Sequence, residues 1–457
     1  MSSRTQNNDR LLATLRLRQV ATARELGEAL GASQPSISRL LTTAGNQVVK
    51  IGHARSSRYA VVRDVRGLGN RWPLYRIDTA GQPQIFGQLV ALHGGSCWLD
   101  TEQAVSWLRD EFSDGLFPGL PWFIDDMRPQ GFLGRLFAQQ HARELGLSED
   151  IMRWDSDAVL AALLRRGEDG PGNFVLGESS LERALRANPI PIPSTAREQR
   201  YAALADATLA GEQVGSSAAG EQPKFTACVE TIDGHQRYVI VKFSERVETN
   251  PVGRRWADLL ISEHLAGELL AEHGLPSAKS ELVWSDGRLC FESTRFDRIG
   301  SYGRRGVISL AAWSDAHDGI RDNWAAAAER MHRRDWLTTD ALMQIQQLWW
   351  FGQMIGNTDM HFGNLAFFLD DALPLTPCPS YDMLPMLYRP ASSGSMPPRD
   401  YQPPPPIPAA LLQWQQAAVW ATAFWQRVAE HADVSTDFRS IADDNRAHMV
   451  HLRQRFG

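Results

Sequence analysis

The sequence predicts an α+β protein in which a small basic domain precedes a mixed middle segment and a two-lobed core. Charge is uneven: the first 66 of 457 residues carry 11 Lys/Arg and 4 Asp/Glu, whereas the remainder carries 36 and 49. Strand-like apolar runs lie in the middle of the chain, and helical patterns dominate its end. The charge shift and the Pro- and Gly-rich stretches predict a domain at 1–66 and a middle segment at 67–200 ahead of the core.

Composition favours a folded globular protein, with 43% hydrophobic and 22% charged residues. We find neither a secretory leader nor an apolar run of ~18 residues, and therefore expect a soluble, cytoplasmic protein. Cys97, Cys228, Cys290 and Cys378 are scattered and form no C-x-x-C pair. This spacing indicates ordinary thiols rather than a zinc site or a disulfide framework.

The basic segment predicts a winged helix-turn-helix domain over residues 20–60. Thr22 can cap a first helix, Gly31 breaks it, and Ser33 with Pro35 can begin a second helix. An alternating hairpin follows as the wing. The net positive charge favours DNA binding, with a basic module for protein contacts as the alternative. The candidate DNA contacts are the side chains expected to point outward from the second helix and two arginines near the tip of the wing: Gln34, Ser36, Ser38, Arg39, Arg55 and Arg58.

The middle segment carries no recognisable chemistry and is interpreted as a scaffold. We expect a strand hairpin over 75–92 and helices over 131–145 and 157–166. GPGNFVLG (170–177) and PIPIPS (189–194) are interpreted as turns or linkers because of their Gly and Pro content.

The segment GEQVGSSAAGEQPKF (211–225) precedes an apolar strand and is rich in small residues. Such loops let backbone N–H groups approach phosphates, although most glycine-rich segments are only turns. The next strand, RYVIVKF, places Lys242 directly after three consecutive apolar residues, and Glu263 falls on an apolar stripe of the following helix. A buried carboxylate needs a partner, and Lys242 is the obvious candidate.

The strongest pattern is GNTDMHFGN (356–364), which follows a long apolar helix and precedes an apolar strand. It places Asp359 and Asn364 five residues apart, and Asp382 follows in PSYDMLP. Phosphoryl transfer uses this set: one carboxylate accepts the proton of the attacking hydroxyl, and an amide oxygen and a second carboxylate hold Mg²⁺. Asn and Asp also populate ordinary turns, but their order relative to Lys242 and Glu263 favours catalysis.

These segments resemble the HipA-like toxin kinases of bacterial toxin–antitoxin systems. The resemblance rests on SAAGEQPK, VIVKF, SEHLAGELLAEHGL, RFDR, GNTDMHFGN and SYDMLP, in this order over about 215–390. It implies a bilobal, protein-kinase-like α+β core, with a small lobe over 201–300 and a mostly helical large lobe over 301–457. The family's small mixed N-terminal subdomain, with a linker, would occupy 67–200. The basic domain lies outside the usual family pattern, in which the DNA-binding part is a separate antitoxin chain.

The resemblance also implies roles. Asp359 is the expected catalytic base, Asn364 and Asp382 the Mg²⁺ ligands, and Ser217 or its neighbour Ser216 the autophosphorylated residue. Phosphate there would add negative charge beside the ATP phosphates and inactivate the loop. Pro223, Thr294 and Gly363 depart from common family residues. The expected nucleotide-binding residues are Ala219, Gly220, Glu221, Gln222, Pro223, Lys224, Lys242, Glu263, Thr294, Arg295, Phe296, His361, Asn364, Tyr381 and Asp382.

We therefore expect an ATP- and Mg²⁺-dependent Ser/Thr protein kinase that phosphorylates a translation component, such as a tRNA synthetase, and arrests growth. DNA and an antitoxin are the other expected partners. One alternative is a DNA-binding transcription regulator whose kinase-like body senses nucleotide. A second is a kinase for a small molecule. The proline-rich segment after Asp382 is either a stiff surface loop or a docking segment.

Overall fold

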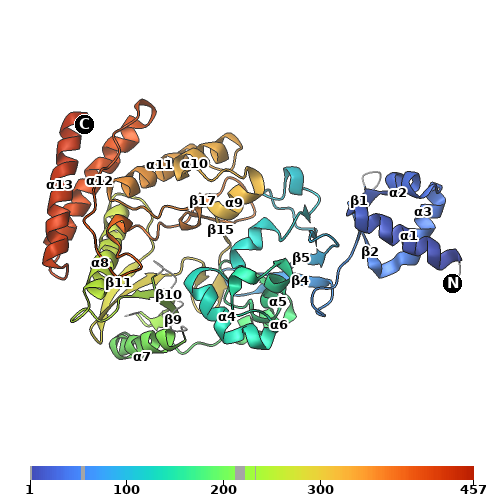
Figure 1. Ribbon diagram of the computed structural model, residues 1–457, viewed down its shortest axis with the longest axis horizontal. Helices are drawn as coiled ribbons and strands as arrows, with labels where there is room; N and C mark the ends of the chain where they lie inside the picture. Colours follow the sequence, from blue (N-terminus) through green and yellow to red (C-terminus); the bar gives the residue numbers. More distant parts are fainter. Residues whose placement is uncertain (1–2, 53–56, 212–221, 232, 457) are drawn as a thin grey trace.

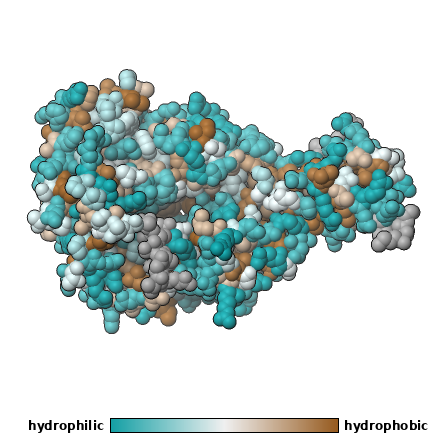
Figure 2. All heavy atoms as spheres, viewed as in Figure 1, coloured by the Kyte–Doolittle hydropathy of each residue, from teal (hydrophilic) through white to brown (hydrophobic). Residues whose placement is uncertain are grey.

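The computed structural model describes residues 3–52, 57–211, 222–231 and 233–456. Figure 1 shows a compact head at one end, a middle domain next to it, and beyond that a sheet-containing small lobe and a helical large lobe side by side. The head stands at one end of the molecule, joined to the rest by a narrow waist, and the visible surface is mostly hydrophilic (Figure 2).

The head contains three helices and a three-stranded sheet of order β1-β3-β2. A capping box begins α2, since the Thr22 hydroxyl accepts from Glu25 N at 3.3 Å and the Glu25 carboxylate accepts from Thr22 N at 2.7 Å. Gly31 ends α2 in the left-handed conformation, as predicted. Helix α1, which precedes β1, was not predicted from the sequence. The elements are α1 (Ser3–Arg18), β1 (Val20–Thr22), α2 (Ala23–Leu30), α3 (Gln34–Ala44), β2 (Val48–Ile51) and β3 (Arg58–Val61).

An apolar cluster joins the head to the middle domain. Val49 and Ile51 of the head are buried against Val90 and Trp98 of the middle sheet. Main-chain bonds cross the same boundary, with Arg63 N donating to Ala91 O at 2.9 Å. Apolar burial and continued strand pairing therefore fix the head against the sheet.

The middle domain is a five-stranded antiparallel sheet of order β7-β6-β5-β4-β8 with three helices. The predicted hairpin and both predicted helices are present. The interpretation of 170–177 as a turn or linker was wrong in part, because Phe174–Leu176 forms a buried strand paired with β4. The elements are β4 (Arg71–Ile77), β5 (Pro83–Ala91), β6 (Cys97–Asp100), β7 (Leu116–Phe117), α4 (Gly131–Leu145), α5 (Ser156–Arg166), β8 (Phe174–Leu176) and α6 (Glu178–Arg186).

The small lobe is a four-stranded antiparallel sheet of order β11-β12-β10-β9. Helix α8 packs on this sheet and is apolar nearly all round, as expected of a helix buried between two layers. Two short strands form a hairpin after the sheet. The elements are α7 (Arg197–Ala210), β9 (Lys224–Glu230), β10 (Gln236–Phe243), α8 (Pro251–Glu272), β11 (Ser280–Ser285), β12 (Arg288–Thr294), β13 (Arg298–Ile299) and β14 (Gly303–Arg304).

The large lobe is mostly helical around a core rich in fully buried tryptophans. Helices α11, α12 and α13 pack side by side (Figure 1). None of the helices in the described part of the chain is long and apolar enough to cross a membrane. The elements are β15 (Val307–Ser309), α9 (Leu310–His317), α10 (Trp324–Arg333), α11 (Thr339–Met354), β16 (Ala366–Phe368), β17 (Thr376–Pro377), α12 (Leu411–Glu430) and α13 (Thr436–Phe456).

His317, the last residue of α9, is enclosed by aromatic rings. Its side chain is fully buried beside Phe112, Trp122, Trp313 and Trp336. Neither ring nitrogen has a hydrogen-bond partner among the described residues. Burial lowers the pKa of His317 to about 4, compared with ~6.5 in an unfolded chain.

This difference makes the folded state acid-sensitive. The unfolded chain binds the His317 proton at higher pH, so the stability gained from a neutral His317 is complete above about pH 6.5. It is lost as pH falls through 6.5 toward 4. His317→Phe should reduce the loss of unfolding free energy between pH 7 and pH 4 by roughly 2–3 kcal/mol, measured by urea unfolding at both pH values. If wild type and variant lose the same unfolding free energy between pH 7 and pH 4, His317 is not the source of the acid sensitivity.

Candidate functional site

A buried lysine between two carboxylates lies where the lobes meet. The Lys242 ammonium, on β10, donates to both oxygens of Glu263 on α8, at 2.7 and 2.8 Å. It also contacts the carboxylate of Asp382, whose backbone N–H donates to Glu263 Oε1 at 3.2 Å. The predicted Lys242–Glu263 pair is therefore present. Asp382, from the large lobe, joins it.

Electrostatics keep this cluster charged despite its burial. Burial lowers the pKa of Lys242, but Asp382 and Glu263 outweigh this effect and raise it above its ordinary value. Burial disfavours the charged form of Asp382 too, yet Lys242 and Lys224 hold its pKa below its usual value. The pKa of Glu263 is raised, chiefly by burial and further by Asp382. The cluster thus retains an ammonium group in a site of low dielectric.

The turn after α11 brings Asp359 and Asn364 close to Asp382. Asn357 connects them, because its amide donates to Asp382 O at 3.1 Å and its side-chain oxygen accepts from Asp359 N at 3.0 Å. The Asn364 amide nitrogen donates to Asp359 O at 2.9 Å, which leaves its oxygen for another ligand. Asn357 is buried and was not singled out from the sequence. Only its place between Gly356 and Asp359 could have indicated it, as an Asx turn.

The segment around Asp382 is also held in place. Asp382 has a left-handed backbone (φ 54°), which is uncommon for a residue other than glycine and often marks a functional site. Tyr381 donates its hydroxyl to Gly363 O at 2.7 Å, and Phe296 packs against the Tyr381 ring at 5.7 Å between centroids. Trp324 donates to His361 O at 3.1 Å. The turn is therefore fixed from several sides.

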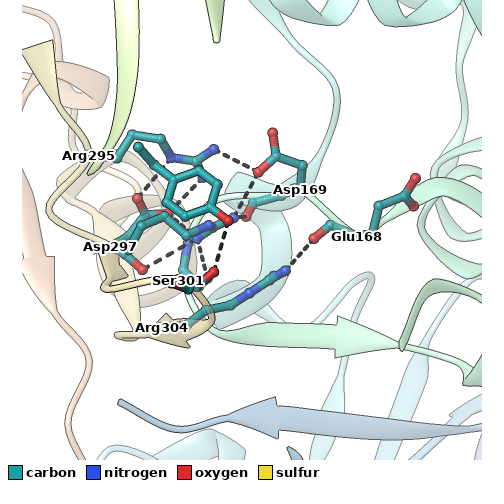
Figure 3. Close-up of polar contacts among 10 residues, drawn as sticks. Glu168, Asp169, Arg295, Asp297, Ser301 and Arg304 are labelled. Carbon is teal, nitrogen blue, oxygen red and sulfur yellow. Dashed lines mark hydrogen bonds and ion pairs between the residues drawn. The ribbon is translucent and has the colours of Figure 1, made fainter. Parts of the chain in front are cut away.

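A buried ion network joins the small lobe to the middle domain (Figure 3). Asp297 accepts two bonds of 3.0 Å from Arg295 and one of 2.7 Å from Arg298. Asp169, from the middle domain, accepts from Arg295 at 2.7 Å and from Arg298 at 3.1 Å. Burial opposes ionisation of Asp297, but Arg295 and Arg298 hold its pKa far below the usual range. The guanidinium of Arg295 is thus committed to carboxylates.

Two family models match this chain. Residues 216–451 match the model of the HipA-like C-terminal domain, which covers the small and large lobes. Residues 68–185 match the model of the YjjJ-like toxin middle domain. The head lies before both matched ranges.

A curated relative extends the similarity over nearly the whole chain. Toxin YjjJ of Escherichia coli (strain K12) is 36% identical over 435 residues, which cover 95% of this chain and 96% of the relative. The chain belongs to the HipA-like toxin family.

One solved structure supports the HipA-like fold. HipA of Shewanella oneidensis MR-1, solved with HipB and operator DNA, superposes with a TM-score of 0.51 at 16% identity. The match covers 84% of this chain and 97% of that chain. The Helicobacter pylori proinflammatory kinase CtkA superposes at 11% identity with a TM-score of 0.34. That match covers 50% of this chain and 93% of the CtkA chain.

Most of the nucleotide-binding residues expected in this HipA-like chain lie within the described ranges. Gln222 donates its amide to Phe243 O, and Lys224 is the cross-strand partner of Lys242. Thr294 is the last residue of β12, and its N–H donates to Lys279 O at 2.8 Å. Pro223 accepts from Phe243 N at 3.2 Å. The residues predicted from the sequence that lie outside the described ranges are Arg55, Ser216, Ser217, Ala219, Gly220 and Glu221.

In the head of the HipA-like chain, the predicted DNA contacts differ in their accessibility. Gln34, Ser38 and Arg39 are exposed on α3. Ser36 is half-buried and shares a 3.0 Å bond with Ser33. Arg58 forms an ion pair with Asp114 of the middle domain, so its charge is already neutralised within the chain.

The ion network predicts a large difference between two Asp→Asn substitutions in this HipA-like protein. Asp297→Asn leaves two buried guanidinium groups with Asp169 as their remaining carboxylate, and should cost about 3–5 kcal/mol of unfolding free energy. Asp371→Asn is the control, because Asp371 is 56% exposed in its pair with Arg76, and should cost about 0–1 kcal/mol. Urea unfolding followed by tryptophan fluorescence measures both. Equal costs would show that the network adds no special stability.

Proposed function

We propose that this protein is an ATP-dependent Ser/Thr protein kinase. The observation that carries the proposal is the clustering of Lys242, Glu263 and Asp382 beside a turn that presents Asp359. This arrangement supplies both a fixed cation for phosphates and a carboxylate for the attacking hydroxyl. Membership of the HipA-like family supports it.

Each group has one chemical task in the proposed reaction. Lys242, held by Glu263, neutralises phosphate oxygens of ATP. Asp359 accepts the proton of a Ser or Thr hydroxyl as the oxygen forms its bond to the γ-phosphorus and the bond to the ADP oxygen breaks. The products are ADP and a phosphorylated side chain, and the proton leaves from Asp359. The bonds from Asn357 and Asn364 hold the backbone of Asp359 in place.

The donor set suits Mg²⁺. Among the described residues no group of three or more His, Cys, Asp or Glu side chains could hold a metal ion. Asn364 and Asp382 instead offer an amide oxygen and a carboxylate. Mg²⁺ commonly takes one or two protein oxygens and completes its shell with water and substrate phosphates. Bound there, it would neutralise charge on the phosphates.

The proposed autophosphorylation site, protein target and antitoxin partner are inferred from the sequence and from the family. Ser217 or Ser216 is the proposed site of autophosphorylation, and a translation component the proposed target, with growth arrest as the outcome. An antitoxin is a proposed partner, since the HipA relative was solved with HipB. Phosphate found on a metabolite instead of on protein would favour a small-molecule kinase.

Asp359→Asn tests the catalytic assignment. The amide cannot accept the hydroxyl proton, so we expect phosphate transfer to fall by about 10²–10⁴-fold while ATP binding persists. Radiolabelled ATP measures transfer to the protein itself and to lysate proteins, and calorimetry measures binding. Asp370→Asn is the control, because Asp370 is an exposed carboxylate whose ion pair is with Arg305 and not with a residue of the proposed site. Wild-type transfer by Asp359→Asn would exclude Asp359 as the base. ATP binding by wild type without transfer would favour the nucleotide-sensing regulator.

We also propose that the head binds DNA through α3. Its exposed side chains, Gln34, Ser38 and Arg39, lie on one short helix that follows a tight turn. This placement is typical of a helix that enters the major groove. The operator DNA in the HipA–HipB structure supports a DNA role in the family. The head would then hold the kinase on DNA, in an autoregulatory role.

Arg39→Ala should weaken DNA binding at all sequences and reduce the slope of log affinity against log salt by about 1, as for one lost phosphate contact. Fluorescence anisotropy on the protein's own promoter fragment and on an unrelated fragment measures both effects. Arg186→Ala is the control, since Arg186 is an exposed arginine of the middle domain. The DNA proposal fails if the two variants bind alike or if the wild type does not bind at low salt.

A further inference from the structure

A groove of about 550 Å³ runs from the turn that carries Asp359 to the proline-rich segment of the large lobe. One wall is the turn, with Asn357, Thr358 and Asp359, and the opposite wall includes Asp400 and Gln402. Its volume lies within the range of ~300–1,000 Å³ common for ligand sites. Whatever occupies the groove therefore lies beside the proposed catalytic base.

The proline-rich wall is held rigidly by the helices behind it. Tyr401 is buried, its hydroxyl donates to Met354 O, and Trp425 donates to that hydroxyl at 3.1 Å. Trp414 donates to Pro404 O at 2.9 Å. Prolines have a fixed φ angle, which limits motion of the rest of the segment. The groove is thus formed before any ligand enters, which lowers the entropic cost of binding.

The charge of the groove favours a cationic ligand over an anionic one. Its lining contains two carboxylates, Asp359 and Asp400, and none of the described residues that line it is Lys or Arg. Lys242 and Asp382, which belong to the proposed phosphate site, do not line it. His361, one of the expected nucleotide-binding residues, also lines the groove. The two carboxylates nevertheless disfavour an anion along the rest of the groove and attract a cationic segment. Asp400 is exposed, and its one contact with a described side chain is a 2.5 Å bond from Gln402.

We propose that this groove receives the protein substrate as an extended segment with a Lys or Arg near the phosphorylated Ser or Thr. The hydroxyl lies at Asp359, and the basic side chain pairs with Asp400. Trp349, which also lines the groove, gives the segment an apolar surface. This inference rests on the proposed kinase function and adds the substrate's local chemistry to it.

A positional-scanning peptide library tests the inference. Each peptide has one fixed Ser or Thr, and radiolabelled ATP reports transfer by the full chain. Wild type should prefer Lys or Arg at one flanking position by roughly two- to fivefold, as for a partly exposed charge pair. Asp400→Asn should lose this preference, and Asp400→Lys should prefer Asp or Glu there. The KM for ATP should not change, because Asp400 is outside the nucleotide site.

Glu430→Lys is the matched control, because Glu430 is exposed at the end of α12 and does not line the groove. It should keep the wild-type preference. A preference that is unchanged in Asp400→Lys, or that is for acidic residues in wild type, overturns the inference. Transfer to the protein itself but to no peptide also overturns it and leaves the kinase proposal standing. Transfer to neither overturns both.

Discussion

The site depends on the buried contact of Lys242 with Glu263 and Asp382. A lone ammonium group in this position would be costly, and so would either carboxylate alone. The charged groups come from a strand, a helix and a large-lobe segment, and the Lys242 ammonium contacts both carboxylates and offsets their mutual repulsion. The contact therefore ties the small lobe to the large lobe at the point where the proposed chemistry occurs.

Other polar contacts extend this constraint outward. Asn357 links the backbone of Asp382 to that of Asp359, so the proposed base and the proposed metal ligand move as one unit. The Arg295–Asp297–Arg298 network joins the small lobe to the middle domain through Asp169. The family resemblance implies that the RFDR motif, which contains Arg295 and Phe296, lies near the nucleotide. In the structure the Arg295 side chain serves the domain boundary, and Phe296 is the member that packs beside Tyr381.

Local patterns predicted several elements closely because short-range physics decides them. Thr22 and Gly31 delimit α2 through a capping box and a left-handed residue, both properties of a few neighbouring residues. The helix over 131–145 matches α4 residue for residue. Phe174–Leu176 was missed because a short apolar run between glycines resembles a turn until another strand pairs with it. Arg58 was expected near the tip of the wing as a DNA contact, and the structure pairs it with Asp114, a partner far away in sequence.

The sequence by itself determined the order and identity of the chemical groups: a lysine at a strand end, a carboxylate on an apolar helix, and an Asp–Asn pair in a turn before a second Asp. It could do so because residue type and spacing constrain what chemistry is available. Only the tertiary structure decided which groups meet. Asp382 joins Lys242, Asn357 connects the two halves of the site, and Asp400 faces the same groove as Asp359. These contacts join residues far apart in the chain or depend on the backbone path of a turn. Packing of the lobes settles them, and local sequence preference does not.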